Sequence, residues 1–332
     1  MSDMDMNENN TKSYLKSEKW RYALDTLTIC LGTLVFLLFL NLGSPIVNFV
    51  SNLGTIAKTP VKEEKIAVSF PNVSLEAKAA YVYDAKTGKE IFELNGEAQL
   101  PLASLTKIMT AVTALSILPD YAVVNIDKNF LKNGKDAELY ANESWRFKDL
   151  LSLTLVESSN AGAGAIAAVA GAFEAGDQNY DSGLKNFIEK MNENAKKIGL
   201  NQTYYTNGTG LDTNSEISGS YGSARDMAKL MSYAVQKYPD IFEATKNDGL
   251  KVDSLNKIKH DAKNTNLFVD KIPMLLGSKT GLTDLAGGNL AIVFDAGFDH
   301  PIGVVVLGSS EKGRFEDVEK LVWASIEYLN GN

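Results

Sequence analysis

A long segment near the N terminus carries no charge: residues 26–57 contain no Asp, Glu, Lys or Arg. A helix needs about 20 predominantly apolar residues to cross the hydrocarbon core of a membrane. The segment Tyr22–Leu42 supplies that length with a single charge, Asp25. Basic residues mark the cytoplasmic side of a membrane helix, and four precede this segment: Lys12, Lys16, Lys19 and Arg21. We therefore expect a single-pass anchor with a cytoplasmic N terminus and everything after residue 45 outside.

Two other interpretations of this segment remain open. A cleaved signal peptide has an apolar core of roughly 7 to 15 residues, which is shorter than this run, and residues 54–57 are a weak cleavage site. A buried core helix would be followed by partner helices, whereas a polar linker follows here at 58–68. The anchor is favoured. It divides the chain into an expected cytoplasmic tail, a transmembrane helix, a linker and an exported domain, at residues 1–21, 22–45, 46–74 and 75–332.

The composition excludes several classes of protein. Acidic residues outnumber basic ones by 41 to 33, which gives a net charge of −8. Nucleic-acid-binding proteins usually carry a basic face, so we expect no nucleic-acid partner. Cys30 is the single cysteine, so neither an intramolecular disulfide nor a cysteine metal cluster can form. The two histidines, His260 and His300, are forty residues apart in stretches predicted to be polar loops. We therefore expect no metal and no cofactor.

Residue periodicity indicates the secondary structure of the exported part. Residues 79–94 predict a β-hairpin, and residues 105–118 are apolar almost all round, which is typical of a helix buried on every side. Strands at both ends with helices between them predict an α+β domain. In it an antiparallel sheet joins the N- and C-terminal strands, and the middle forms a helical lobe beside a cleft. The other expected helices are 161–173, 184–198, 224–238 and one from Phe315, and the other β-rich segments are 289–295 and 302–307.

One hydroxyl and one amine lie three residues apart where a loop meets the buried helix: Ser104 and Lys107. On a helix they share a face, and N–H groups at a helix start can stabilise a developing oxyanion. A buried Lys107 would have a lowered pKa and would serve as a general base for Ser104. The alternative is a capping serine followed by a surface lysine, a pattern that is common by chance. A lysine inside an apolar helix favours the functional interpretation.

Two further clusters are ambiguous when each is taken alone. Glu157–Asn160 opens a helical run and is typical of a helix cap. The sequence Gly277-Ser278-Lys279-Thr280-Gly281 has a lysine and a threonine that can receive a carboxylate. Its alternative interpretation is a basic turn with two glycines. The three clusters together are more specific than any one of them.

In order, Ser-x-x-Lys, Ser-x-Asn and Lys-Thr-Gly form the motif set of penicillin-binding proteins and serine β-lactamases. The chain closely resembles the serine D-alanyl-D-alanine carboxypeptidase family, the low-molecular-mass penicillin-binding proteins. This resemblance covers roughly residues 75 to 330. Beyond the motifs, it is carried by residues 81–111, 207–211, 224–227 and 279–287.

The resemblance implies a β-lactamase/penicillin-binding transpeptidase-like fold and a serine acyl-transfer enzyme without a metal. It implies that Ser104 is the nucleophile, that Lys107 is its base, and that Ser158 relays a proton to the leaving group. It implies that Asn160 binds a substrate amide. Lys279, Thr280 and Gly281 bind the terminal carboxylate and the adjoining peptide, which adds to the sheet as a strand. The backbone N–H groups of Ser104 and Leu282 form the oxyanion hole.

The chain also departs from the family pattern. Asn160 is followed by Ala161 and Gly162, where the family often has Asp-Ala. Many members anchor themselves by a C-terminal amphipathic helix, a role that we expect the N-terminal segment to take here. Arg314 matches a family position that assists carboxylate binding in some members, and its alternative role is a surface ion pair.

The expected function is a membrane-anchored serine D,D-carboxypeptidase that removes the terminal D-alanine from peptidoglycan stem peptides and is acylated by β-lactam antibiotics. A D,D-endopeptidase that cuts cross-links would share every motif. A β-lactamase of the commonest class needs a glutamate in a Glu-x-x-Leu-Asn segment, and none occurs between Asn160 and Lys279. An inactive wall-binding scaffold would not need Ser104, Lys107 and Lys279 together.

Overall fold

The computed structural model describes residues 69–133, 139–176 and 179–331. The predicted tail, the predicted membrane helix and most of the predicted linker lie outside these residues. Among the helices of the described ranges, none combines the length and apolar character that a membrane crossing requires. The described residues belong to the predicted exported domain and to the end of the predicted linker.

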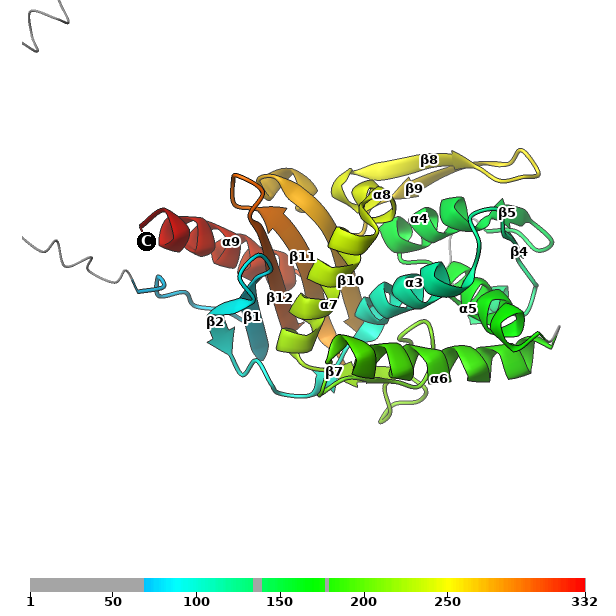
Figure 1. Cartoon of the computed structure of the whole chain (residues 1–332), viewed down its shortest axis with the longest axis horizontal. Helices are drawn as coiled ribbons and strands as arrows, with labels where there is room; N and C mark the ends of the chain where they lie inside the picture. Colours follow the sequence, from blue (N-terminus) through cyan, green and yellow to red (C-terminus); the bar gives the residue numbers. More distant parts are fainter. Residues whose placement is uncertain (1–68, 134–138, 177–178, 332) are drawn as a thin grey trace, which may run out of the picture. The chain divides into compact units, whose positions relative to one another are not determined.

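A five-stranded antiparallel sheet joins the two ends of this domain (Figure 1). Its strand order is β10-β11-β12-β1-β2, so β10 is an edge strand. Ala79 near the start of the domain pairs with Leu307 near its end, which confirms the predicted sheet, and the antiparallel pairing of β1 with β2 confirms the predicted hairpin. The bounds are β1 (Ala79–Asp84), β2 (Lys89–Leu94), β10 (Leu275–Thr283), β11 (Gly287–Asp295) and β12 (Pro301–Ser309).

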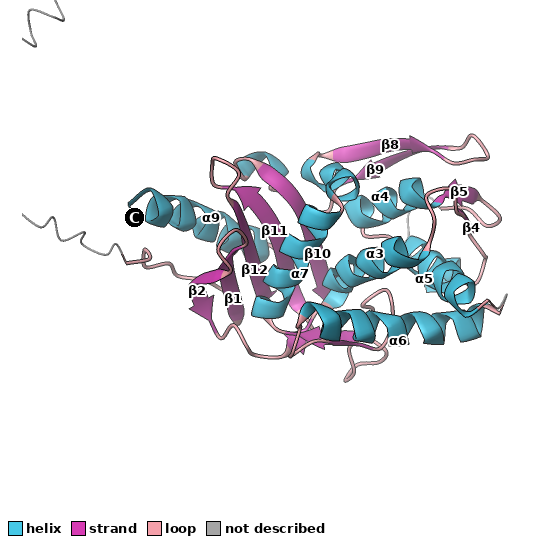
Figure 2. Cartoon of the chain, in the orientation of Figure 1, coloured by secondary structure: helices cyan, strands magenta, loops and turns pink. Residues whose placement is uncertain are grey.

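Helices cover both faces of the sheet. Side chains alternate along each strand: Tyr81 and Val305 belong to the core beneath helix α7 (Ala224–Lys237), whereas Val82 and Val304 belong to the core beneath helix α9 (Gly313–Gly331). Figure 2 shows α7 crossing in front of the strands. Because both faces are buried, the central strands are nearly continuous apolar runs.

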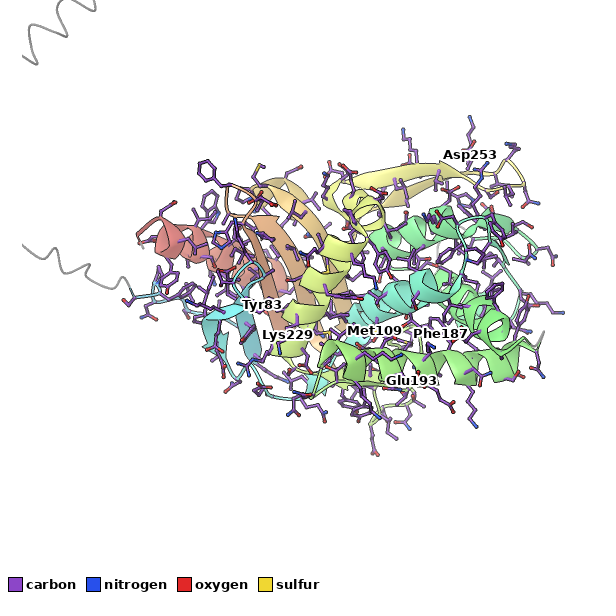
Figure 3. The ribbon with its side chains drawn as sticks, in the orientation of Figure 1. Tyr83, Met109, Phe187, Glu193, Lys229 and Asp253 are labelled. Atoms are coloured by element: carbon purple, nitrogen blue, oxygen red, sulfur yellow. The ribbon has the colours of Figure 1, made fainter. Side chains whose placement is uncertain are left out.

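The helical lobe lies beside the β10 edge of the sheet (Figure 1). Met109 and Phe187, labelled in Figure 3, are fully buried in the core that α3 and α6 share. The predicted helices are confirmed, and α4 was not predicted. The lobe helices are α3 (Thr106–Ile117), α4 (Phe147–Glu157), α5 (Asn160–Ala175) and α6 (Tyr180–Ile198).

Small elements connect these two parts. They are the paired strands β3 (Leu100–Pro101), β7 (Ser220–Gly222) and β6 (Tyr204–Tyr205), the hairpins β4 (Val123–Asn125) with β5 (Ser144–Arg146) and β8 (Gly249–Asp253) with β9 (Lys259–Lys263), and α8 (Pro239–Phe242). Short 3₁₀ helices complete them: η1 (Ala103–Leu105), η2 (Phe130–Asn133), η3 (Glu243–Lys246) and η4 (Val269–Lys271).

The prediction that both histidines lie in polar loops is wrong for His260. This residue lies in β9, is 4% exposed, and places Nε2 at 2.7 Å from Glu143 Oε1. Its ring also packs against Trp145. Charged residues fill the exposed face of β9, and its inward positions are His260 and Ala262. The segment therefore looks like a polar loop in the sequence, although it is a strand. His300 lies between β11 and β12, as predicted.

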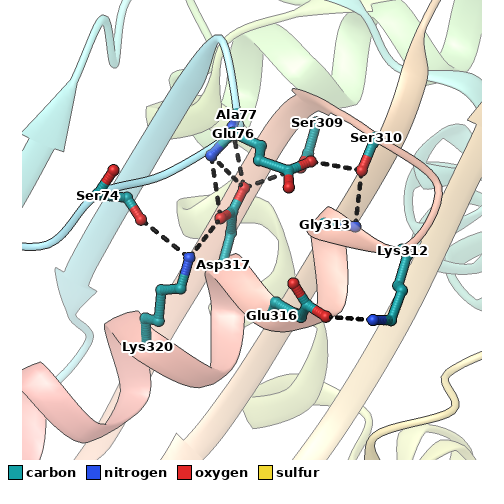
Figure 4. A network of polar contacts seen from close by, with 10 residues as sticks. All are labelled: Ser74, Glu76, Ala77, Ser309, Ser310, Lys312, Gly313, Glu316, Asp317 and Lys320. Atoms are coloured by element: carbon teal, nitrogen blue, oxygen red, sulfur yellow. Dashed lines mark hydrogen bonds and ion pairs between the residues drawn. The ribbon is translucent and has the colours of Figure 1, made fainter.

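A buried carboxylate ties the chain before β1 to the last helix (Figure 4). Asp317 of α9 is fully buried and accepts hydrogen bonds from the backbone N–H groups of Glu76 and Ala77 and from Ser309 Oγ at 2.8 Å. Lys320 Nζ lies 3.5 Å from the same carboxylate. Asp317 therefore holds three segments together: the approach to β1, the end of β12 and α9.

Replacing Asp317 by alanine is expected to lower the free energy of unfolding by about 3 kcal/mol, because buried donors would lose a charged acceptor. The matched control is Glu316→Ala, which removes an exposed carboxylate of the same helix paired only across the surface with Lys312. We expect no measurable change for the control. Denaturant unfolding of both variants makes the comparison, and superimposable curves for Asp317→Ala and wild type would contradict the role assigned to Asp317.

Candidate active site

The serine and the lysine of the first motif are in contact. Ser104 lies in η1, which leads directly into α3, and Lys107 lies in the first turn of α3. Lys107 Nζ is 2.9 Å from Ser104 Oγ. Lys107 is 1% exposed, so its interpretation as a surface lysine is wrong. The reason is that α3 is buried on all sides at this end, as its apolar sequence predicts.

Two further acceptors surround the same amine. Lys107 Nζ donates to Asn160 Oδ1 at 2.7 Å and to the carbonyl oxygen of Thr209 at 2.8 Å. Asn160 begins α5, and Thr209 lies in the connection between β6 and β7. The structure therefore brings Asn160 to the Ser104–Lys107 pair, as the motif order predicts, and adds Thr209 to it.

The second motif spans the short connection between α4 and α5. Ser159 caps α5, because its side chain accepts a hydrogen bond from the N–H of Gly162. Ser158 has a positive φ of 65°, a conformation that turns the chain sharply between the helices. Ser158 Oγ accepts a hydrogen bond from Lys279 Nζ at 2.8 Å. The capping role predicted for this cluster thus falls to Ser159, while Ser158 contacts the third motif.

The third motif lies within the edge strand β10, so its interpretation as a basic turn is wrong. Lys279 is 1% exposed, and Thr280 Oγ1 contacts Thr265 Oγ1 at 2.7 Å. Position 281 is a glycine for a steric reason. A Cβ atom there would lie 2.9 Å from the carbonyl oxygen of Leu102. A small residue lets β10 pass close to the segment that carries Ser104. Leu282, the next residue of β10, is exposed.

Three basic side chains lie at or near the third motif: Lys279, Lys107 and Arg314. Burial lowers the pKa of Lys279 well below its ordinary value, and the charges of Lys107 and Arg314 lower it further. Arg314 is 7% exposed and donates from Nη1 to the carbonyl oxygen of Gly281 at 2.8 Å. Burial also lowers the pKa of Arg314. The surface ion pair considered for Arg314 is therefore wrong, and the arrangement suits an anionic ligand.

Sequence reasoning did not assign a role to Thr209 or Thr265. Thr209 acts through its backbone carbonyl, which no side-chain motif reveals. Thr265 follows β9 and reaches the site because its N–H donates to the carbonyl oxygen of Val156 at the end of α4. The glycine-rich run 207–211 was the one signal that the connection carrying Thr209 has a special shape.

A sheet with helices on both faces, a helical lobe at its edge and a Ser-x-x-Lys pair between them define the class of penicillin-binding, transpeptidase-like proteins. One solved structure of this class is penicillin-binding protein D2 from Listeria monocytogenes in its cefotaxime-bound form. The similarity has a TM-score of 0.64 and 28% sequence identity, and it covers 76% of this chain and 98% of that one.

The chain belongs to the D-alanyl-D-alanine carboxypeptidase family of serine hydrolases, whose family model matches residues 64–311. It is 31% identical over 255 residues to D-alanyl-D-alanine carboxypeptidase DacF of Bacillus subtilis, covering 74% of this chain but only 61% of that relative's length. It is 28% identical over 272 residues to the D-alanyl-D-alanine endopeptidase of Escherichia coli, covering 80% of this chain and 82% of that protein.

Proposed function

We propose that the protein is a serine-type D-alanyl-D-alanine carboxypeptidase that removes the terminal D-alanine from peptidoglycan stem peptides. The observation that carries this proposal is the 2.9 Å contact between Lys107 Nζ and Ser104 Oγ. It joins a hydroxyl to an amine that is buried in the protein, which is the arrangement that an activated serine nucleophile requires. Family membership gives the substrate class.

In the proposed acylation step, neutral Lys107 takes the proton of Ser104 while Oγ attacks the carbonyl carbon of the penultimate D-alanine. The N–H groups of Ser104 and Leu282 stabilise the oxyanion. Ser158 then relays the proton held by Lys107 to the leaving nitrogen, the C–N bond breaks, and D-alanine departs while Lys107 is neutral again. Water hydrolyses the ester on Ser104, which restores the hydroxyl and releases the shortened peptide.

The proposed substrate lies along β10. Its terminal carboxylate binds Lys279 and Thr280, with Arg314 adding positive charge behind Gly281. The edge position of β10 supports this arrangement, because an extended peptide can add to an edge strand through main-chain hydrogen bonds. Asn160 binds a substrate amide from the opposite, helical side of the site.

The charge of Lys279 predicts a pH dependence. Because its pKa is lowered, Lys279 loses its proton at a lower pH than an ordinary lysine, and its attraction for a carboxylate disappears as pH rises through that pKa. The affinity for a peptide ending in a free D-Ala carboxylate is therefore expected to fall as pH rises. The affinity for the same peptide with a C-terminal amide should not follow. Competition against penicillin labelling measures both affinities, and parallel pH profiles for the two peptides would refute the role of Lys279.

A D,D-endopeptidase is the second candidate, because the E. coli relative with that name matches across 82% of its length. The two activities are separated by two substrates: a monomeric stem pentapeptide and a cross-linked stem dimer. We expect release of D-alanine from the pentapeptide at a higher kcat/KM than cleavage of the dimer. The opposite ranking would make the protein an endopeptidase.

We also propose that β-lactams acylate Ser104, as the cefotaxime-bound form of the Listeria protein suggests.

We further propose that the chain is anchored in the cell membrane with its catalytic domain outside. The uncharged run 26–57 and the basic residues before it support the anchor. The test is sedimentation with membranes after an alkaline wash. Full-length protein should remain bound and a variant lacking residues 1–45 should not, and release of both would contradict the anchor.

A further inference from the structure

The three contacts of Lys107 Nζ suit a neutral amine as well as an ammonium ion. A neutral amine has two N–H bonds and one lone pair, and a general base must aim the lone pair at the proton that it takes. The carbonyl oxygens of Asn160 and Thr209 lie at 2.7 and 2.8 Å from Nζ and can accept the two N–H bonds. The lone pair can then face Ser104 Oγ. The Thr209 carbonyl thus helps to set the direction of the base.

One side chain shapes the loop that carries this carbonyl. Asn207 Oδ1 accepts hydrogen bonds from the N–H groups of Thr209 and Gly210, at 3.1 and 2.7 Å, and from Thr209 Oγ1 at 3.1 Å. Asn207 Nδ2 donates to the carbonyl oxygen of Leu211 at 3.0 Å. The loop 207–211 is therefore folded around a single amide group.

Asn207 is one of several groups that hold this loop: Thr110 Oγ1 also donates to the carbonyl oxygen of Gly208 at 2.6 Å. On one side the loop is in close contact with the segment that carries the nucleophile: Gly210 has a φ of +79°, and a Cβ atom there would lie 1.9 Å from the carbonyl oxygen of Ala103. On another side, Asn207, Thr209 and Leu211 line a pocket of about 200 Å³. This pocket leaves space beside the loop, so the loop is not packed tightly on that side.

We propose that Asn207 is a positioning residue for the general base: it fixes the loop 207–211 so that the Thr209 carbonyl orients Lys107 toward Ser104. In this role Asn207 acts through the backbone of the loop. The inference rests on the proposed function, because it concerns the base of that same reaction.

The test compares Asn207→Ala and Asn207→Asp in the full-length protein by the second-order rate constant of penicillin acylation across pH. Asn207→Ala is expected to acylate about 10- to 100-fold more slowly than wild type, since a catalytic group displaced by about 1 Å loses up to that factor. It should also move the acid limb of the pH–rate profile to lower pH, because ammonium loses an acceptor. Asn207→Asp keeps the oxygen acceptor but adds a negative charge, which favours ammonium, so its acid limb should move to higher pH.

The matched control is Asn214→Ala. Asn214 accepts from the N–H groups of Glu216 and Ile217 in the same β6–β7 connection, but in an exposed turn. The control should acylate at the wild-type rate. The inference is overturned if Asn207→Ala acylates as fast as the control, or if neither Asn207 variant moves the acid limb. If Asn207→Ala does not fold, Asn207→Ser takes its place, with the same expected loss of rate and the same expected shift of the acid limb. Absence of acylation in wild type would instead overturn the proposed function.

Discussion

Replacing Ser104 by alanine is expected to abolish both the covalent penicillin adduct and the release of D-alanine. The change removes the hydroxyl that lies 2.9 Å from Lys107 Nζ. Ser158 is not expected to take over, because its Oγ accepts a hydrogen bond from Lys279 and its proposed role is proton transfer to the leaving group. No acyl-enzyme can form without a nucleophile, so the loss should be complete rather than partial. The fold should be unaffected, since the side chain removed is small.

The measurement is fluorescent-penicillin labelling together with an assay of free D-alanine. Ser116→Ala is the control, because Ser116 lies on the same helix and its hydroxyl only donates to the carbonyl oxygen of Thr113. That variant should label at the wild-type rate. Labelling of Ser104→Ala at the wild-type level would show that the nucleophile lies elsewhere.

Replacing Lys107 by methionine is expected to slow acylation by about 10²- to 10⁴-fold, the range that general-base catalysis usually contributes. Methionine keeps most of the buried volume, so the variant tests the amine rather than the packing. Some reaction should survive, because Ser104 and the N–H groups of the proposed oxyanion hole remain.

The rate constant for penicillin acylation, followed by stopped flow, measures this loss, and circular dichroism checks that the variant is folded. Lys190→Met provides the comparison, since Lys190 is a lysine whose ion pair with Glu174 lies on the surface. We expect wild-type kinetics for it. An unchanged rate in Lys107→Met would mean that another group takes the proton of Ser104.

The elements that sequence patterns predicted are those whose signal is local. The hairpin β1–β2 combines alternating side chains with a turn, and α3 is a long apolar run, so each is visible without its neighbours. The β8–β9 hairpin was missed because its exposed positions are charged and its inward side includes a histidine. Helix α4 was missed although its inward face is apolar, because its residues also fit a buried strand.

The residues of the site also fall into those that a local motif predicts and those that only tertiary contacts bring in. Ser104, Lys107 and Lys279 stand in short motifs with fixed spacing, and the structure brings Ser104 to Lys107 and Lys279 to Ser158. The partners Thr209 and Arg314 act through tertiary contacts: one through a backbone carbonyl, the other with the carbonyl of Gly281. Such contacts depend on how distant segments pack, which local sequence does not encode.

The central claim is that Ser104 forms the acyl-enzyme of a D-alanyl-D-alanine carboxypeptidase. The most direct test is the intact mass of the full-length protein over time with penicillin, followed by peptide mapping of the adduct, with D-alanine release from a stem pentapeptide measured in parallel. We predict a long-lived adduct of one penicillin on Ser104 together with released D-alanine. Rapid penicillin turnover without a lasting adduct would indicate a β-lactamase, and no reaction with either compound would indicate an inactive scaffold; each would contradict the claim.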